Sequence, residues 1–174
     1  MNLGNILSQS QGVPIIEWPI QFHFTKPAQK EQVLISAFLL PVSEADRARS
    51  RNEALQFLKT NATSPFYRIF QAEKEEAEER RGSYQEPFEI PERDLNLELQ
   101  YKFISYSLYT KEENGSLAKL IRTEADYVLF REGVILRVLE FMYERYNSLI
   151  DQEYPETLPP KKRKDLEDEA LKKS

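Results

Sequence analysis

The segment from Thr123 to Ile150 restricts the possible folds of this chain more than any other part of its sequence. Apolar side chains recur along it at helical spacing, and further apolar side chains continue around the same cylinder. The polar positions form only a narrow seam, made of Arg137, Glu140, Glu144 and Asn147. A surface helix normally carries a broad polar face opposite a narrower apolar stripe. The segment therefore predicts a helix over residues 124–150 that is either central in its domain or presents an apolar face to another chain.

We expect this helix to divide its apolar surface between the core and a partner. The stripe predicted to face the core contains Ile135, Val138 and Met142. The offset aromatic set predicted to contact a partner contains Phe130, Phe141 and Tyr143. Aromatic side chains are the stronger candidates for partner contact, because buried aromatic residues dominate the energetics of interfaces. Gly133 predicts a bend in this helix or a point of close helix approach.

Length and composition favour one helix-rich domain with polar extensions. The chain has 174 residues, of which 40% are hydrophobic and 30% charged, which suits a single modest core. It has no cysteine, so disulfides, thiolate nucleophiles and cysteine-based zinc sites are excluded. The formal net charge of −5 argues against broad nucleic-acid binding. No run of about 18 apolar residues is present, so we expect no transmembrane helix.

The N-terminal part predicts an antiparallel β-hairpin over residues 15–40, preceded by a flexible segment at residues 1–13. From Trp18 to Thr25 apolar and polar residues alternate, which is typical of a half-buried strand. Pro19 removes one backbone donor from this strand, so we expect the strand to lie at a sheet edge or to start late. A short polar link leads to a second apolar run. Such a hairpin is not stable alone and needs a helical layer over its apolar face.

Four helices are expected to supply that layer, at about residues 43–59, 65–81, 94–109 and 124–150. A serine or threonine with an aspartate three residues later predicts a capped start for the first and the last of them. The segment 94–110 could also be a strand, because its leucines and aromatic residues fit both periods. Its length, and its lack of glycine and proline, favour a helix.

Two segments are expected to lie outside these elements. Residues 83–93 contain two prolines and predict an extended connector. Residues 156–174 form a charge-block tail that we expect to be disordered, or to form a loose helix after Pro160. The basic cluster at 160–164 resembles a nuclear-localisation patch, but a solvated tail is the simpler interpretation. The predicted fold class is α+β and mostly helical: a single domain over residues 14–155, with a small N-terminal antiparallel β-hairpin packed on an α-helical bundle.

The sequence contains no arrangement of residues that predicts catalysis, a cofactor or a metal site. His23 is the only histidine, and it lies on the polar side of the first strand without a second histidine or a cysteine to share a metal. The five glycines are scattered and match no glycine-rich phosphate-binding pattern. The clustered carboxylates fall in solvated runs at 73–79 and 165–169, whereas a catalytic carboxylate needs partial burial to tune its pKa. We therefore predict a protein that is not an enzyme.

Two stretches of the chain resemble the tail assembly chaperones of long-tailed bacteriophages. The first, Val33 to Leu58, is an apolar strand, a Pro-x-Ser step and then an acidic, arginine-rich helix. The second, Leu108 to Pro155, has an Asn-Gly turn, a short apolar segment and a capped helix that ends in YNSLIDQEYP. The resemblance is one of organisation and spacing, and residues 83–93 have no counterpart in it.

The resemblance implies a non-enzymatic protein of the infected bacterial cytoplasm that is absent from the mature virion. Such chaperones bind the long, aggregation-prone tape measure protein and help to recruit tail-tube subunits. Protein partners, and copies of the chain itself in a homo-oligomer, are therefore the expected partners, with no membrane.

Two other functions fit the residues. A structural or adaptor subunit of a phage particle, or of another oligomeric assembly, would bury the same helix against copies of itself. A small regulatory protein would use the basic residues of the tail on nucleic acid, and the acidic net charge counts against it.

Overall fold

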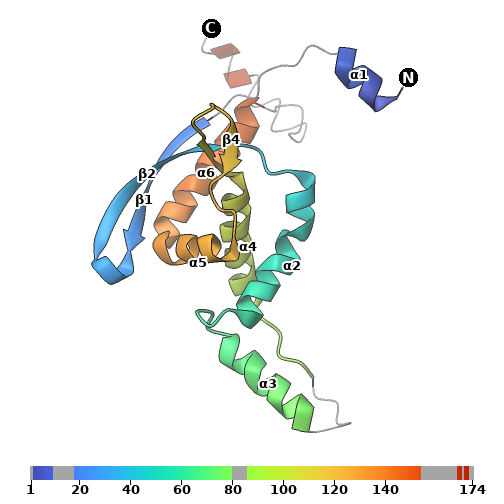
Figure 1. Cartoon of the computed structure of the whole chain (residues 1–174), viewed down its shortest axis with the longest axis vertical. Helices are drawn as coiled ribbons and strands as arrows, with labels where there is room; N and C mark the ends of the chain where they lie inside the picture. The colour runs from blue at the N-terminus through green and yellow to red at the C-terminus, as the bar shows by residue number, and fades with distance from the viewer. Residues whose placement is uncertain (1, 10–17, 80–85, 154–167, 170, 173–174) are drawn as a thin grey trace.

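The computed structural model describes residues 2–9, 18–79, 86–153, 168–169 and 171–172, and it shows an α+β fold that is mostly helical (Figure 1). The strands are β1 (Trp18–Lys26), β2 (Glu31–Leu39), β3 (Leu108–Lys111) and β4 (Leu117–Lys119), and they form one antiparallel sheet in that order. The helices are α1 (Leu3–Gln9), α2 (Glu44–Thr60), α3 (Tyr67–Glu79), α4 (Glu92–Ser107), α5 (Glu124–Gly133) and α6 (Leu136–Glu153).

The predicted N-terminal hairpin is confirmed. β1 and β2 pair along their whole length, from Trp18 opposite Leu39 to Lys26 opposite Glu31, and a single 3₁₀ turn at Pro27–Gln29 joins them. Ile20 and Phe22 are buried, whereas Gln21 and His23 are exposed, because successive side chains of a strand point to opposite faces. β1 is an edge strand of the sheet, as its proline predicts. The hairpin curves around α5 and α6 (Figure 1).

The terminal segments are described only in part. The segment expected to be flexible at residues 1–13 contains α1, whose described side chains are exposed, and residues 10–13 lie outside the described residues. In the predicted tail at 156–174, only residues 168–169 and 171–172 are described, and they are helical.

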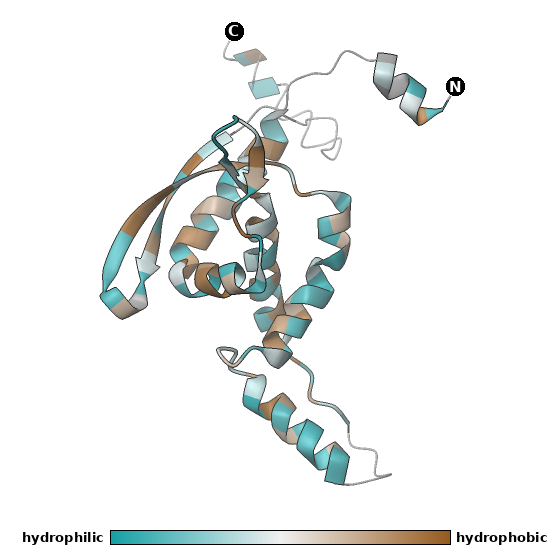
Figure 2. Ribbon diagram, viewed as in Figure 1, coloured by the Kyte–Doolittle hydropathy of each residue, from teal (hydrophilic) through white to brown (hydrophobic). Residues whose placement is uncertain are grey.

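Helix α3 projects from the rest of the molecule (Figure 1), and its far end is hydrophilic (Figure 2). None of its residues is buried. The described part of the connector returns along it: the ring of Phe88 lies between those of Phe66 and Phe70, with centroid distances of 5.9 and 5.8 Å. The backbone N–H of Phe88 also donates a hydrogen bond to Glu73. The predicted extended connector is thus held against α3 by aromatic contacts.

The ambiguous segment at 94–110 is a helix that continues into a strand. α4 ends at Ser107, and the next four residues form β3, which pairs with β2 through Leu108 and Leu39. Both leucines are almost fully buried. β3 then pairs with β4 around a turn in which Gly115 has a positive φ of 80°. The short apolar run after the Asn-Gly turn is therefore the fourth strand of the sheet.

The single continuous helix predicted over residues 124–150 is wrong, because the chain bends between α5 and α6. The bend predicted at Gly133 is confirmed. The start of α5 is as predicted, with a capping box between Thr123 and Asp126. At the bend, a Cβ on Gly133 would overlap the ring of Phe24 from β1. The hydroxyl of Tyr101 donates a 2.7 Å hydrogen bond to the carbonyl of Val134. The strand and α4 therefore fix the bend from outside the segment.

The core lies between the inner face of the hairpin and helices α2, α4, α5 and α6. Among its least exposed side chains are Leu39, Ile104, Leu108, Val134, Leu139, Met142 and Leu149. The hydroxyl of Tyr146 accepts a 3.0 Å hydrogen bond from the backbone N–H of Val42, which connects α6 to the segment between β2 and α2. No helix in the described part of the chain is long and apolar enough to cross a membrane.

Candidate interaction surface

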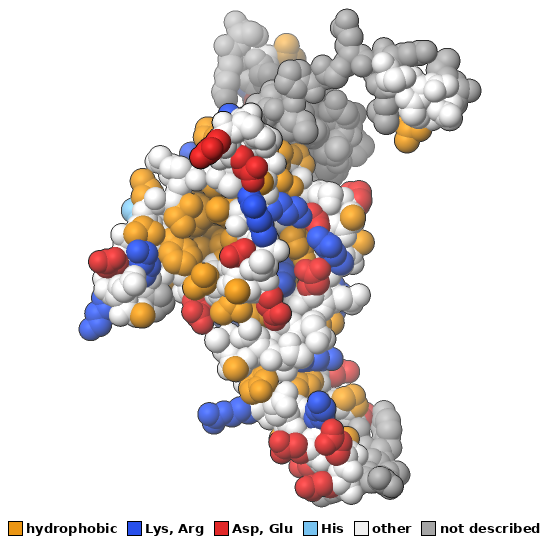
Figure 3. Space-filling view, in the orientation of Figure 1, with side chains coloured by type: hydrophobic (Ala, Val, Ile, Leu, Met, Phe, Trp, Pro, Cys, Tyr) orange, Lys and Arg blue, Asp and Glu red, His pale blue; other side chains and the backbone are white. Residues whose placement is uncertain are grey.

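Exposed apolar side chains concentrate on α5, on α6 and at the bend between them. Four of the eight exposed large hydrophobic residues in the described chain are Leu129, Ile135, Leu136 and Phe141, with exposed fractions of 59, 49, 48 and 40%. We call these four residues the α5–α6 surface. Figure 3 shows hydrophobic side chains gathered over these helices, beside the β-hairpin. Single exposed apolar residues are ordinary, but a concentration of them indicates a binding surface.

The structure separates the three aromatic residues predicted to contact a partner. Phe130 is only 2% exposed and packs in the core, with its ring edge-on to that of Tyr101. Its assignment to the partner face is therefore wrong. Tyr143 is half-buried, and its ring lies 6.1 Å from that of Phe103. Phe141 is exposed, so it alone of the three lies on the α5–α6 surface.

The predicted core stripe is corrected in the same way. Met142 is fully buried as expected, but Ile135 is about half exposed. Ile135 lies after Gly133, where the bend ends the single helical phase that the prediction continued across the segment. Phe130 lies before the bend and is buried against Tyr101 from α4, a contact that periodicity does not show. Leu129 in α5 and Leu136 in α6 are also exposed, and the sequence prediction assigned neither of them to the partner face.

A shallow hollow with both apolar and polar walls lies beside Phe141, between α6 and the start of β1. It consists of two adjoining cavities of about 400 and 250 Å³, which share Pro19, Ile20 and Arg145. Phe141 and Gln21 complete the first cavity, and Trp18 and Leu39 complete the second. The guanidinium of Arg145 lies 5.7 Å from the centroid of the Phe141 ring. We call these two cavities together the β1–α6 hollow.

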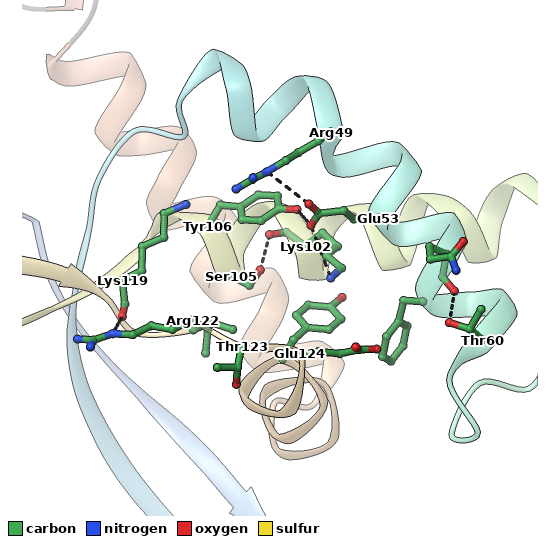
Figure 4. Close-up of a pocket in the computed structure, with 14 residues that line it drawn as sticks. Arg49, Glu53, Thr60, Lys102, Ser105, Tyr106, Lys119, Arg122, Thr123 and Glu124 are labelled. Carbon is green, nitrogen blue, oxygen red and sulfur yellow. Dashed lines mark hydrogen bonds and ion pairs between the residues drawn. The ribbon is translucent and has the colours of Figure 1, made fainter.

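A larger open groove of about 550 Å³ lies between α2, α4 and α5 (Figure 4). Its centre is Glu53, which accepts a hydrogen bond from the hydroxyl of Tyr106 and pairs with Arg49 at 3.3 Å and Lys102 at 3.9 Å. The ammonium group of Lys102 also lies 3.6 Å from the centroid of the Tyr127 ring. Burial lowers the pKa of Lys102, although the surrounding glutamates act in the opposite direction.

Carboxylates of the protein itself neutralise the cations of this groove. Its four basic side chains are Arg49, Lys102, Lys119 and Arg122. Each lies within ion-pair distance of Asp46, Glu53 or Glu112. Asp46 is itself buried, and its carboxylate accepts a 2.6 Å hydrogen bond from the ammonium group of Lys119. This ion-pair network therefore joins α2 to β4. The charged side chains of this groove therefore form an ion-pair network that joins structural elements of the chain.

A second buried network joins α4 to α5. The carboxylate of Glu98 is 1% exposed, accepts a 2.5 Å hydrogen bond from the hydroxyl of Tyr127 and pairs with Arg131 at 2.9 Å. Burial and the neighbouring Glu98 raise the pKa of Tyr127, so this phenol stays protonated as a donor. Arg131 also lies over the ring of Tyr101 at 3.9 Å. Sequence reasoning missed Glu98, because nothing local distinguishes it from the exposed glutamates of the chain.

The remaining polar residues form no further site in the described ranges. His23 is exposed on the outer face of β1. Within the ranges that the structure describes, no group of three or more His, Asp or Glu side chains is arranged to hold a metal ion. No protein-family model matches this chain, and no curated protein and no solved structure matches it either.

Proposed function

We propose that this protein is a non-enzymatic tail assembly chaperone of a long-tailed bacteriophage. In this role it binds the tape measure protein and helps to recruit tail-tube subunits. One observation carries the proposal: the α5–α6 surface lies within the stretch from Leu108 to Pro155, which carries the resemblance to that family. The exposed apolar side chains and the sequence resemblance thus point to the same part of the chain.

The proposed mechanism is stoichiometric covering of a client. A tape measure protein is a long chain whose apolar helical segments aggregate unless they are covered. Leu129, Leu136 and Phe141 supply apolar area for such segments, and the energy of binding comes from removing that area from water. Binding of this kind needs no nucleotide and ends when the assembling tube displaces the chaperone.

Co-expression with the tape measure protein of the same genome tests the proposal. The wild-type chain should keep the tape measure protein in the soluble fraction and elute with it. A double variant, Leu129→Ser with Leu136→Ser, should lose most of this effect, because central apolar contacts dominate interfaces. Leu34→Ser is the matched control: Leu34 is 55% exposed but lies on the opposite, outer face of the hairpin. Equal solubility with and without the chain would refute the proposal.

The alternative is a structural or adaptor subunit of the particle, since copies of the chain could bury the same apolar surface. Mass spectrometry of purified particles separates the two functions. A chaperone is found in the infected cytoplasm and is absent from the finished virion, whereas an adaptor subunit is present in a fixed ratio to the other structural proteins.

A further inference from the structure

We propose that the β1–α6 hollow binds a polypeptide segment in which an apolar side chain stands next to an aspartate or glutamate. The apolar side chain enters the hollow, and the carboxylate pairs with Arg145. This inference rests on the proposed function, because it specifies the chemistry of the partner at one end of the same surface, where Phe141 belongs to both.

The apolar half of the recognition comes from the walls of the hollow. Phe141 and Ile20 line the first cavity, and Trp18, Ile20 and Leu39 line the second. Ile20 and Leu39 are almost fully buried, so Trp18 and Phe141 supply most of the exposed apolar surface. The two cavities share three residues, so a side chain that enters one lies beside the other. Burying an apolar side chain there removes both its surface and that of Phe141 from water.

The preference for an acidic residue in the peptide comes from the guanidinium group of Arg145. In the described chain, no carboxylate lies within ion-pair distance of its guanidinium, and its interaction is with the Phe141 ring. The four cations of the groove between α2, α4 and α5, in contrast, are all paired within the chain. Arg145 lines both cavities, so it can reach a carboxylate at the mouth of either. Guanidinium groups bind carboxylates with two parallel hydrogen bonds.

A polypeptide fits this position better than a nucleic acid or a lipid surface. β1 is an edge strand in the described part of the sheet, and an edge strand is where an extended segment can add to a sheet. A polyanion would need several cations, whereas the hollow offers one.

The experiment selects peptides from a random linear library on the full-length chain, on Arg145→Glu and on Arg137→Glu. Arg137 is the matched control, because it is an exposed arginine of the same helix that lines neither cavity. The wild type and Arg137→Glu should both enrich peptides with an apolar residue beside Asp or Glu. A synthetic peptide of that pattern should bind Arg145→Glu about tenfold or more weakly by fluorescence anisotropy, the loss of one charge-assisted contact. Selection on Arg145→Glu should favour Lys or Arg at the acidic position.

Three outcomes would overturn the inference. The wild type could enrich no peptide, it could enrich peptides without an acidic residue, or the acidic peptide could bind Arg145→Glu as tightly as wild type. Concentration-dependent self-association lost in Arg145→Glu, without peptide binding, would assign the hollow to a second copy of the chain instead. Because these assays contain no tape measure protein, their failure leaves the co-expression result standing, and peptide binding stands if co-expression fails.

Discussion

Replacing Gly133 with alanine tests the packing that bends the chain between α5 and α6. A Cβ at this position would lie 2.7 Å from Cδ2 of Phe24 and closer still to the outer ring atoms. Carbon atoms in ordinary contact are about 3.5–4.0 Å apart, so either the ring or the helix must move. Overpacking of this kind costs about 1–3 kcal/mol. Alanine favours a helix over glycine by about 1 kcal/mol, but less at the end of α5.

The expected net effect of Gly133→Ala is a loss of about 1–2 kcal/mol in the free energy of unfolding. For a chain of this size that lowers the Tm by about 2–8 °C. The assay is urea denaturation of wild type, Gly133→Ala, Phe24→Ala and the double variant. In the Phe24→Ala background the ring is absent, so Gly133→Ala should be neutral or slightly stabilising. A coupling energy of at least about 1 kcal/mol should result. If Gly133→Ala is equally destabilising in both backgrounds, Phe24 does not explain the glycine.

Three further predictions follow from the packing and charges of the described residues. Met142→Ala should lower the free energy of unfolding by about 2–5 kcal/mol in urea denaturation, because Met142 is fully buried. Phe141→Ala should lower it by less than about 1 kcal/mol, because Phe141 is exposed. Equal losses would contradict the assignment of Met142 to the core and Phe141 to the surface. Glu98→Ala should cost about 3 kcal/mol, the low end for a broken buried ion pair, since Arg131 is 30% exposed and can be hydrated. Glu98→Gln keeps an acceptor for Tyr127 and should cost less in the same assay. Burial alone would raise the pKa of Asp46, but Lys119, Ser43 and Arg49 outweigh burial and lower this pKa. The ionised carboxylate therefore stabilises the fold above about pH 4. This stabilisation is lost as the pH falls through the lowered pKa of Asp46. Asp46→Asn should therefore be less stable than wild type at pH 7, with the difference shrinking towards pH 3; a difference independent of pH would exclude this ionisation as its cause.

Local patterns in the sequence determined the elements whose signals lie within a few residues of one another. The alternation from Trp18 predicts which side chains of β1 are buried, because strand geometry assigns faces by position alone. Thr123 and Asp126 predict the start of α5, because both hydrogen bonds of the capping box close within one turn. Pro19 predicts an edge strand, because proline lacks a backbone donor.

Tertiary contacts decided the features that join distant parts of the chain. Residues 108–111 form a strand because they pair with β2. Their sequence alone predicts that the preceding helix continues to about residue 109. The bend after Gly133 depends on Phe24 from the first strand and on Tyr101 from α4, and neither is visible in the sequence around the glycine. Phe130 is buried and Ile135 is about half exposed, so tertiary packing decides which apolar residues can meet a partner. Periodicity assigns a face only relative to its own helix axis, and the packing of other elements sets where that axis changes direction.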